Sequence, residues 1–506
     1  MTTELVRIED GIAITTFKDK LGRVVLERQN GNDTYYVYDL KGMLCYVLPP
    51  LAAKQISTGV HGDDVAVLKK YAYIYKYDER GNQIYKRLPG CEPIRMVYDK
   101  SNALVLSQTG NQRTRGTFWT VYKYDNLKRL IYTTEVNTRS NDHEELMESF
   151  SQWYVVEQFS TGSMNHPMAN TGYSRGYYHI QPTELLTVNY YDTYDFLTFV
   201  ADENQNNMAF EAFDGNNTYA NAKGLLTGTR TYYLTGTDGY SETVYYYDYR
   251  GREIQRRTTN HLEGIDVLST KYDYVNNIID TWSSQSTSNG IQITEHYHYT
   301  YDHANRPVET QYTYNDESPI ILQSYNYDEL GRVRSRHIHG GIDSIAFAYD
   351  IRNQVTQIKS SGYEQNYYYT QTFPVRNELV QKAYNGNIAA TTWTYGNKTN
   401  GYMYYYDEIN RLQSTYGILD NQWCESLYSE LYQYDAHGNI TYFMRFDDVD
   451  LVDDMFTIYN GNQLIEVEDD YDSQNYSSKE YHDNNDTGND FAYDANGNMI
   501  YDKDRG

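Results

Sequence analysis

The chain has 506 residues, a formal charge of −26 at pH 7 and 59 tyrosines, far more than an ordinary globular protein carries. A surface this acidic repels nucleic acid and anionic lipid, so we expect neither as a partner. No apolar run approaches the ~18 residues of a membrane span. Tyrosine favours strands, because its ring covers pleated neighbours while its hydroxyl stays hydrated. The composition therefore predicts a β-rich protein without a membrane span.

Residues Met1 to Arg7 show neither the basic nor the apolar region of a signal peptide, and we expect none in this chain. The three cysteines are too few and too scattered for a disulfide framework, and none forms a C-x-x-C pair. The chain begins almost directly with a repeat and stops just after one. We therefore expect it to be a piece of a longer protein.

One phrase, YNYDELGRV at 325–333, recurs along almost the whole chain. Aligned on its aspartate, thirteen copies appear, at Asp19, Asp39, Asp78, Asp99, Asp125, Asp248, Asp273, Asp302, Asp328, Asp350, Asp407, Asp435 and Asp494. The residue before the aspartate is tyrosine in twelve copies, and the third residue after it is Gly or Asn in twelve. Such regularity predicts one structural unit used repeatedly.

The residue types predict a hairpin turn. Gly and Asn accept the left-handed backbone at least cost, and an Asp three residues earlier can bond the backbone of the turn that it opens. Together they indicate a type I turn closed by a left-handed residue. The clearest expected turn positions are Asp39, Gly42, Asp78, Gly81, Asp248, Gly251, Asp328, Gly331, Asp435, Gly438, Asp494 and Gly497.

Several copies place an arginine directly after the Gly or Asn, namely Arg23, Arg252, Arg306, Arg332 and Arg411. Each guanidinium could lie over a tyrosine ring of a neighbouring hairpin, or it could be a solvated side chain on a turn. Both interpretations stay open at this point.

In most cases the aspartates of two successive copies lie 20 to 29 residues apart. This spacing is too short for a propeller blade of ~40–45 residues. Hairpins linked in series should instead form one antiparallel sheet that twists as it lengthens. We expect YD-type sheet in 1–132 and 244–506, with a divergent repeat or insertion in 133–243. Within the insertion a short helix is predicted near 142–157, and an acidic mobile loop is expected near 442–490.

The motif Tyr-x-Tyr-Asp-x-x-Gly-Arg, present as YNYDELGR and YYYDYRGR, resembles the YD repeat of the RHS family. That family includes bacterial polymorphic toxins, and its repeat is similar to those of the Tc insecticidal toxins and the teneurins. The resemblance covers most of the chain, with least support between 133 and 243. It implies an all-β fold of YD-repeat hairpins in one long, twisted, spiralling antiparallel sheet, forming a partial or open shell.

The resemblance also implies a function, a location and partners. It indicates a non-enzymatic structural segment of a shell that encapsulates or presents a C-terminal toxin or effector domain, in a secreted or cell-surface protein. The partner would be that domain or the remainder of the same RHS protein, and no cofactor or metal is expected. The sequence has no Asp-Pro dipeptide, which the family's self-cleavage motif contains, so self-cleavage is not implied.

Rows of tyrosine also suit sugars, and the family resemblance carries a proposal of carbohydrate binding. The alternative function is therefore a cell-surface module that binds a glycan or a protein through exposed tyrosines. The candidate ligand-facing residues are Tyr325, Tyr327, Tyr404 and Tyr406. The other interpretation is that these tyrosine rings pack against adjacent strands, which accounts for their presence without a ligand.

Three further motifs have weaker support. The Gly172–Gly176 segment matches the G-x-S-x-G pattern around a nucleophilic serine, Ser174, but lacks the strand and helix that this mechanism needs. The pairs His296/His298 and His337/His339 could begin a zinc site, yet no third ligand is evident. The segment at Asp494 suggests a calcium loop with its Gly misplaced, and the Asp447–Asp454 cluster is best explained as a solvated loop.

Overall fold

A computed structural model of the chain describes residues 2–7, 13–59, 61–138, 142–162, 168, 170–174, 185–199, 207–216, 222–234, 239–315, 317–371, 373, 381–420, 422–423, 427–447, 450–470, 481 and 489–503. Of the 34 strands within these described residues, 32 belong to one sheet, and β33 and β34 form a second. Every pair of strands that the structure describes is antiparallel, and most strands pair with the next along the chain. The expected all-β fold of serial antiparallel hairpins is confirmed.

The chain divides into two compact units, here called unit 1 (1–95, 109–114 and 345–506) and unit 2 (96–108 and 115–344). It passes from one unit to the other within β8 (Ile94–Tyr98) and β22 (Asp343–Tyr349), and again next to α3.

Unit 1 contains two series of strands and three short helices. The first series is β1 (Thr2–Arg7), β2 (Ala13–Lys18), β3 (Val24–Gln29), β4 (Asn32–Tyr38), β5 (Leu44–Leu48), β6 (Tyr73–Tyr77) and β7 (Gln83–Arg87). The second follows β22 with β23 (Val355–Lys359), β24 (Tyr363–Tyr368), β25 (Ala390–Tyr395), β26 (Lys398–Tyr406), β27 (Leu412–Leu419), β28 (Gln422–Trp423), β29 (Glu430–Tyr434), β30 (Ile440–Asp447), β31 (Asp450–Asn460), β32 (Gln463–Asp469), β33 (Phe491–Tyr493) and β34 (Met499–Asp502). The helices are α1 (Pro50–Gln55), α2 (Ala66–Tyr71) and α3 (Gly110–Arg115).

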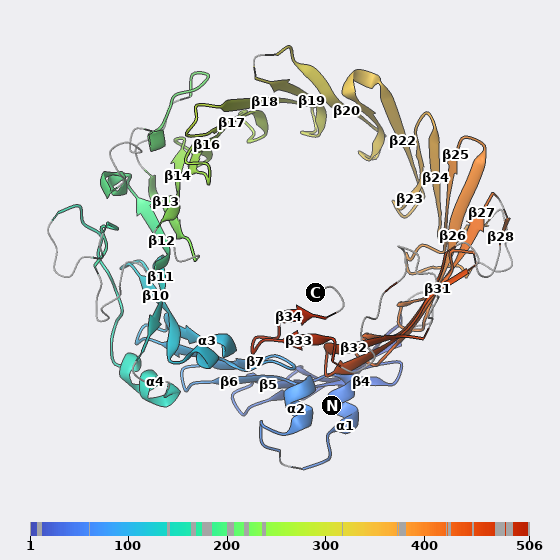
Figure 1. Cartoon of the computed structure of the whole chain (residues 1–506), viewed down its shortest axis with the longest axis horizontal. Helices are drawn as coiled ribbons and strands as arrows, with labels where there is room; N and C mark the ends of the chain where they lie inside the picture. Colours follow the sequence, from blue (N-terminus) through green and yellow to red (C-terminus); the bar gives the residue numbers. More distant parts are fainter. Residues whose placement is uncertain are drawn as a thin grey trace. The chain divides into compact units, whose positions relative to one another are not determined.

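The three short helices of unit 1 were not indicated by the repeat pattern. Helix α1 begins with Pro50, which is tolerated there because the first helical N–H has no partner in the helix. Helices α1 and α2 lie on one side of β4 and β5, and the β33–β34 hairpin lies on the other side (Figure 1).

Unit 2 is a series in which each strand pairs with the next: β9 (Leu104–Gln108), β10 (Phe118–Tyr124), β11 (Leu130–Asn137), β12 (Leu185–Asp192), β13 (Ala222–Tyr232), β14 (Tyr240–Tyr247), β15 (Glu253–Thr259), β16 (Ile265–Tyr272), β17 (Ile278–Ser286), β18 (Gln292–Tyr301), β19 (Pro307–Tyr314), β20 (Ile320–Tyr327) and β21 (Val333–Ile338). It also holds helix α4 (His143–Ser151) and the 3₁₀ segments η2 (Asp195–Phe199) and η3 (His339–Gly341). Helix α4 lies inside the 142–157 stretch and is capped by Asp142, whose carboxylate accepts the N–H of Glu144 at 3.0 Å.

The main hydrophobic core lies in unit 2, where residues of the divergent segment cover the sheet. Strand β10 alternates between buried and half-buried positions, and its Trp119 is fully buried. Leu146 and Phe150 of α4 join the same core. The insertion thus gives this part of the sheet a second layer.

The strands that follow have no such layer. Among the described residues of β18 to β21, only Thr310 is buried, and the others are half-buried or exposed. Strand β22 alternates between half-buried and exposed without one buried residue. The structure therefore contains a stretch of sheet with neither face covered.

The acidic loop expected near 442–490 is wrong over 442–469, where β30, β31 and β32 run. Acidic composition misled the prediction, because these acidic residues are accommodated in strands, and one of them is neutralised within the sheet. The fully buried Asp453 pairs across strands with Arg445, whose guanidinium lies 2.6 Å from its carboxylate. Most of the remainder, 471–480 and 482–488, lies outside the described residues.

Candidate functional site

The repeat turn is built around the carboxylate of its aspartate. At Asp328, Oδ1 accepts the backbone N–H of Leu330 and of Arg332, each at 2.9 Å. The Asp328 N–H donates to the Arg332 carbonyl at 2.9 Å, and the Gly331 N–H donates to the Asp328 carbonyl at 3.0 Å. Gly331 has φ +83°. One side chain thus satisfies the donors of a type I turn closed by a left-handed residue.

The same bonds recur in all thirteen copies. Each aspartate Oδ1 accepts the N–H groups two and four residues later. The third residue has positive φ in every copy, including Lys128 at +63°. The structure places Asp39, Gly42, Asp78, Gly81, Asp248, Gly251, Asp328, Gly331, Asp435, Gly438, Asp494 and Gly497 in this geometry.

The hydrogen bonds at the turn favour the charged carboxylate. At Asp302, the backbone N–H of Arg306 and its guanidinium both donate to the carboxylate, at 2.9 and 2.7 Å. These bonds lower the pKa of Asp302 from 3.8 to about 2.

In four copies an arginine links the turn to the next repeat. The guanidinium carbons of Arg23, Arg252, Arg306 and Arg411 lie 4.4 to 4.7 Å from the ring centroids of Tyr38, Tyr272, Tyr327 and Tyr434, respectively. Each of these rings belongs to the tyrosine just before the aspartate of the next copy. The cation–π interpretation therefore holds for these four arginines.

The hydroxyl of the same tyrosine makes a second link. It donates to the backbone carbonyl of the fifth residue after the preceding repeat's aspartate, in the pairs Tyr38–Val24, Tyr124–Leu104, Tyr272–Glu253, Tyr301–Ile278, Tyr327–Pro307 and Tyr434–Leu412. These distances run from 2.6 to 3.0 Å. The tyrosine that defines the repeat is therefore an inter-repeat contact, a role that the sequence pattern alone did not reveal.

The four candidate ligand-facing tyrosines are placed as follows. Tyr327 donates to Pro307, Tyr406 donates to the Ile388 carbonyl at 2.9 Å, and the Tyr404 hydroxyl lies 3.0 Å from that of Thr391. Tyr325 lies beside Tyr327, with ring centroids 6.5 Å apart. Three of the four hydroxyls thus take part in contacts within the sheet.

A degenerate repeat in the divergent segment helps to build a recess in unit 2. Tyr191 keeps the inter-repeat contacts, because its ring lies under the Arg129 guanidinium at 4.4 Å and its hydroxyl donates to the Leu130 carbonyl at 3.0 Å. Asp192 does not form a repeat turn and has φ +73° itself. Its carboxylate instead accepts two bonds from Arg129, at 2.9 and 2.6 Å.

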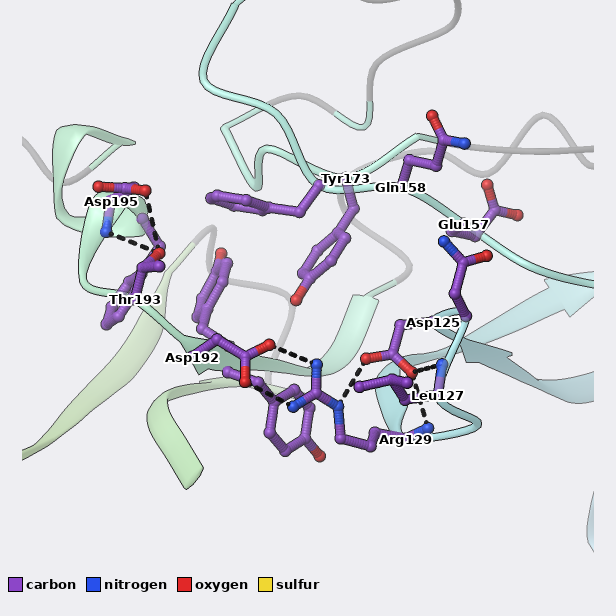
Figure 2. Close-up of a pocket in the computed structure, with 14 residues that line it drawn as sticks. Asp125, Leu127, Arg129, Glu157, Gln158, Tyr173, Asp192, Thr193 and Asp195 are labelled. Atoms are coloured by element: carbon purple, nitrogen blue, oxygen red, sulfur yellow. Dashed lines mark hydrogen bonds and ion pairs between the residues drawn. The ribbon is translucent and has the colours of Figure 1, made fainter. Parts of the chain in front are cut away.

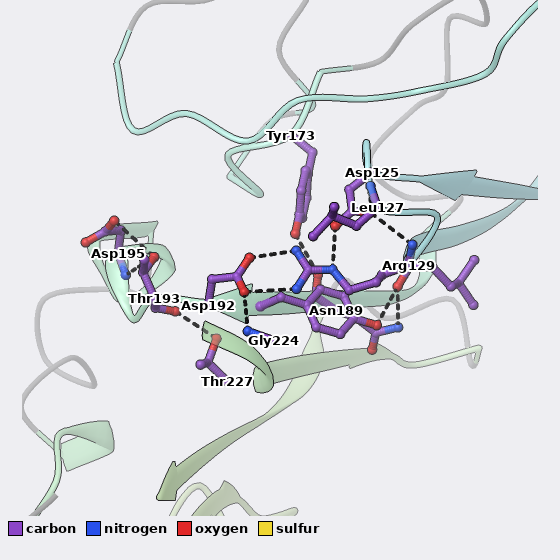
Figure 3. A network of polar contacts seen from close by, with 12 residues as sticks. Asp125, Leu127, Arg129, Tyr173, Asn189, Asp192, Thr193, Asp195, Gly224 and Thr227 are labelled. Carbon is purple, nitrogen blue, oxygen red and sulfur yellow. Dashed lines mark hydrogen bonds and ion pairs between the residues drawn. The ribbon is translucent and has the colours of Figure 1, made fainter. Parts of the chain in front are cut away.

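Arg129 is held between two carboxylates, because its Nε also donates to Asp125 at 2.6 Å (Figure 2). Asp192 accepts a further bond from the N–H of Gly224 at 2.6 Å (Figure 3). Hydrogen bonding to Asp192 raises the pKa of Arg129, and the same bonds lower the pKa of Asp192. This network ties the divergent segment to the repeat that precedes it.

The cavity beside this network has a volume of about 520 Å³ and is lined by aromatic and charged side chains. Tyr190 is sandwiched there between Tyr173 and Phe196, with ring centroids 5.6 and 4.3 Å away. Burial raises the pKa of Tyr190 well above its usual range. Stacking on both sides leaves neither face of that ring free for a ligand.

Ser174 lies next to this cavity and is bonded into a buried ion pair. Its hydroxyl donates to Glu157 at 2.5 Å, and Glu157 pairs with Lys123 at 2.6 Å. No histidine or cysteine is among the described residues that line the cavity. Tyr173, just before Ser174, forms only an isolated bridge to Phe159, and residues 175–184 lie outside the described part. The strand that a nucleophile elbow needs before its serine is not formed.

The structure brings His296 and His298 to a carboxylate that sequence analysis missed. Asp280 of β17 lies opposite His298, and its Oδ1 is 2.9 Å from His296 Nε2 and 2.7 Å from His298 Nδ1. His337 instead contacts Asn326, at 3.1 Å. No group of three or more ligating side chains in the described part of the chain could hold a metal ion.

The last repeat, at Asp494, meets the first part of unit 1. Asn111 of α3 donates to its carboxylate at 2.7 Å, and the Glu92 N–H donates to the Ala495 carbonyl at 2.9 Å. The Asp494 carboxylate also accepts the two backbone bonds of an ordinary repeat turn. This segment is therefore a repeat turn, as in the other twelve copies. Asp448, from the acidic cluster, lies outside the described residues.

No family model and no curated protein sequence matches the chain. Its fold is similar to solved Tc toxin structures. The crystal structure of TcdB2-TccC3-Cdc42 has a TM-score of 0.52 and 14% identity, covering 88% of this chain and 20% of that chain. The Photorhabdus luminescens Tc holotoxin pore with a TccC3 mutation has a TM-score of 0.52 and 13% identity, covering 90% and 20%.

The chain thus spans about a fifth of those chains, and at this identity the likeness shows the fold alone. No helix in the described ranges is both long enough and apolar enough to cross a bilayer.

Proposed function

We propose that the chain is a non-enzymatic structural segment of an RHS/YD-repeat shell, which encapsulates or presents a toxin or effector domain. The observation that carries this proposal is the uncovered sheet in β18 to β21, where the repeats are nonetheless tightly linked to one another. Links between successive repeats, such as Tyr301 to Ile278 and Tyr327 to Pro307, make a wall that holds its form without a second layer. A wall of this kind could enclose a toxin or effector domain.

The chemistry of the repeats supports the same role. Their aspartates, arginines and tyrosines contact each other, as at Asp302, Arg306 and Tyr327, and so serve the sheet. In the divergent segment, the Ser174 hydroxyl is bonded to a carboxylate that Lys123 already neutralises. These groups act as structural ties in this proposal, and no reaction is assigned to them.

The family resemblance and the fold likeness to Tc toxin structures supply the biological setting. In this setting the protein is secreted or displayed at the cell surface. Its partner is a toxin or effector domain, or the remainder of the same protein. The alternative, a module that binds a glycan or a surface protein through exposed tyrosines, depends on rings such as Tyr325 whose contacts within the sheet are few.

Protease protection tests the shell function. The natural protein that contains this chain is digested with proteinase K beside its isolated effector domain, and both are followed by mass spectrometry. Encapsulation predicts that the effector survives at least tenfold longer within the whole protein. Equal digestion rates, with residues 1–506 still intact, would contradict the proposal.

A matched variant sharpens the test. Replacing Arg252, Arg306 and Arg411 together by Gln removes three inter-repeat contacts and should shorten protection, while Arg334→Gln, at an exposed position of β21, should not. For the alternative function, glycan and partner binding that Tyr325→Ala abolishes would favour the surface module instead.

A further inference from the structure

A second recess of unit 2 lies on one face of β15 to β18 and has a volume of about 530 Å³. This is within the range of ~300–1,000 Å³ that small-molecule sites occupy. Alternate residues of each strand line it, so hydroxyl and amide side chains gather on one face: Gln255, Ser269, Ser284, Ser286, Gln292 and Thr294. Residues 207 and 211–213 of the divergent segment form a wall beside it.

A tryptophan forms the apolar part of the lining. Trp282 of β17 lies between Ser269 of β16 and His296 of β18 in the strand register. The imidazole of His296 stacks on the indole at 4.8 Å with an interplanar angle of 4°. On the other side the cross-strand neighbour, Ser269, is too small to cover a ring. Phe213 makes a T-shaped contact with the indole, at 5.5 Å and 63°.

The polar groups around the indole retain hydrogen-bonding capacity. Ser284 accepts a bond from Gln292 at 3.0 Å, and Ser269 accepts one from Gln255 at 3.0 Å, so both hydroxyls have a proton to donate. A flat apolar platform with hydroxyl and amide groups beside it matches a ligand with one apolar face and a polar edge.

The charges of the recess argue against an ionic ligand. Arg257 pairs with Glu211 at 3.3 Å and donates to the Asn207 carbonyl at 2.8 Å. Arg257 is the one cation among the described residues that line the recess, and because it is engaged, the recess offers little to a phosphate or carboxylate. The remaining charged lining residue, Glu263, is exposed.

We infer that this recess binds a neutral saccharide, with the C–H face of one pyranose ring on Trp282 and its hydroxyls on Ser269, Ser284 and Gln292. The inference goes beyond the shell function and does not depend on it. It also differs from binding through the repeat tyrosines, because the platform is a tryptophan on the face of β17 and the wall comes from the insertion.

The test is a glycan array followed by saturation-transfer NMR and calorimetry with methyl pyranosides of the sugars that score. Trp282→Thr, a substitution that suits a strand, should lower the affinity at least tenfold. Trp282→Phe should restore part of the binding, and Ser284→Ala should weaken it several-fold. The control is Trp393→Thr on β25 of unit 1, a half-buried tryptophan that contacts Tyr402, which should leave the affinity unchanged.

Far-UV circular dichroism and the melting temperature establish that each variant is folded. If no saccharide binds to the folded protein, or if binding survives Trp282→Thr undiminished, the inference is wrong. A loss of binding in Tyr325→Ala but not in Trp282→Thr would assign the sugar site to the repeat tyrosines. Protection of an effector domain from protease would be unaffected by either result, so the two proposals fail separately.

Discussion

Replacing Gly331 by valine should destabilise the β20–β21 hairpin more than any conservative change at the same position. The backbone there has φ +83°, and a residue with a Cβ pays roughly 1–2 kcal/mol to adopt the left-handed region. Branching at Cβ raises this cost, so we expect about 2 kcal/mol or more for Gly331→Val. Gly331→Asn should cost only a fraction of that, because Asn353 and Asn410 occupy the same turn position with φ +64° and +68°.

A second contribution at Gly331 can be separated from the first. A Cβ would lie 3.1 Å from Arg306 Nη1, so the guanidinium that stacks on Tyr327 would have to shift. At Gly438, with φ +92°, a Cβ would meet nothing within 4 Å. Gly438→Ala therefore measures the backbone cost alone, and the excess for Gly331→Ala over Gly438→Ala measures the disturbance of the arginine.

The assay is urea unfolding together with hydrogen exchange of the hairpin amides, because repeat sheets need not unfold in one step. Exchange should accelerate in β20 and β21 first. If Gly331→Val leaves both measurements unchanged, or if Gly331→Asn costs as much as Gly331→Val, the assigned turn geometry is not what stabilises the hairpin.

Three further predictions follow from the same contacts. A double-mutant cycle on Arg306→Gln and Tyr327→Leu should give a coupling of about 0.5–1 kcal/mol in urea unfolding, and no coupling would remove the cation–π link. Because the folded-state pKa of Asp302 lies near 2, below its ordinary 3.8, its stabilisation should be complete above that ordinary value. It should be lost as the pH falls towards 2, and Asp302→Asn should flatten this part of an acid titration of stability. Lys123→Met should cost about 3–5 kcal/mol by leaving Glu157 buried and unpaired, whereas adding Glu157→Gln should recover much of the loss.

The repeat turns could be predicted from the sequence because their hydrogen bonds join residues at most four positions apart. One further turn was missed because a different residue type replaces the aspartate. Asn260 forms the same turn, with its Oδ1 accepting the N–H of Leu262 at 3.0 Å and of Gly264 at 2.9 Å. Glu263 takes the left-handed position, with φ +56°. A search for Tyr-Asp cannot find this copy, although an amide oxygen accepts bonds much as a carboxylate does.

Contacts between strands were harder to predict, because each repeat contains a bulge that shifts the register. Tyr272 lies opposite Ile278, but Lys271 lies opposite Asp280, so the pairing slips by one residue between neighbours. A slip of one residue reverses the face to which every later side chain points. The approach of Asp280 to His298 depends on the pairing of β17 with β18, which runs without a shift from Asp280–His298 to Ser286–Gln292. That register was not evident from the spacing of the histidines, and so the third group near them was missed.

The divergent segment explains where recesses arise in a sheet of otherwise uniform repeats. Tyr191 keeps the inter-repeat contacts of a regular copy, while Asp192, freed from turn formation, binds Arg129 of the preceding repeat. The chain can therefore carry a long insertion without breaking the succession of linked strands. Segments of that insertion then lie beside the repeat strands: Phe159 and Tyr173 line the recess at Arg129, and Phe213 lines the one at Trp282. Repeat strands alone give open faces, as in β19 to β21, whereas a strand face and an insertion together give a concave site.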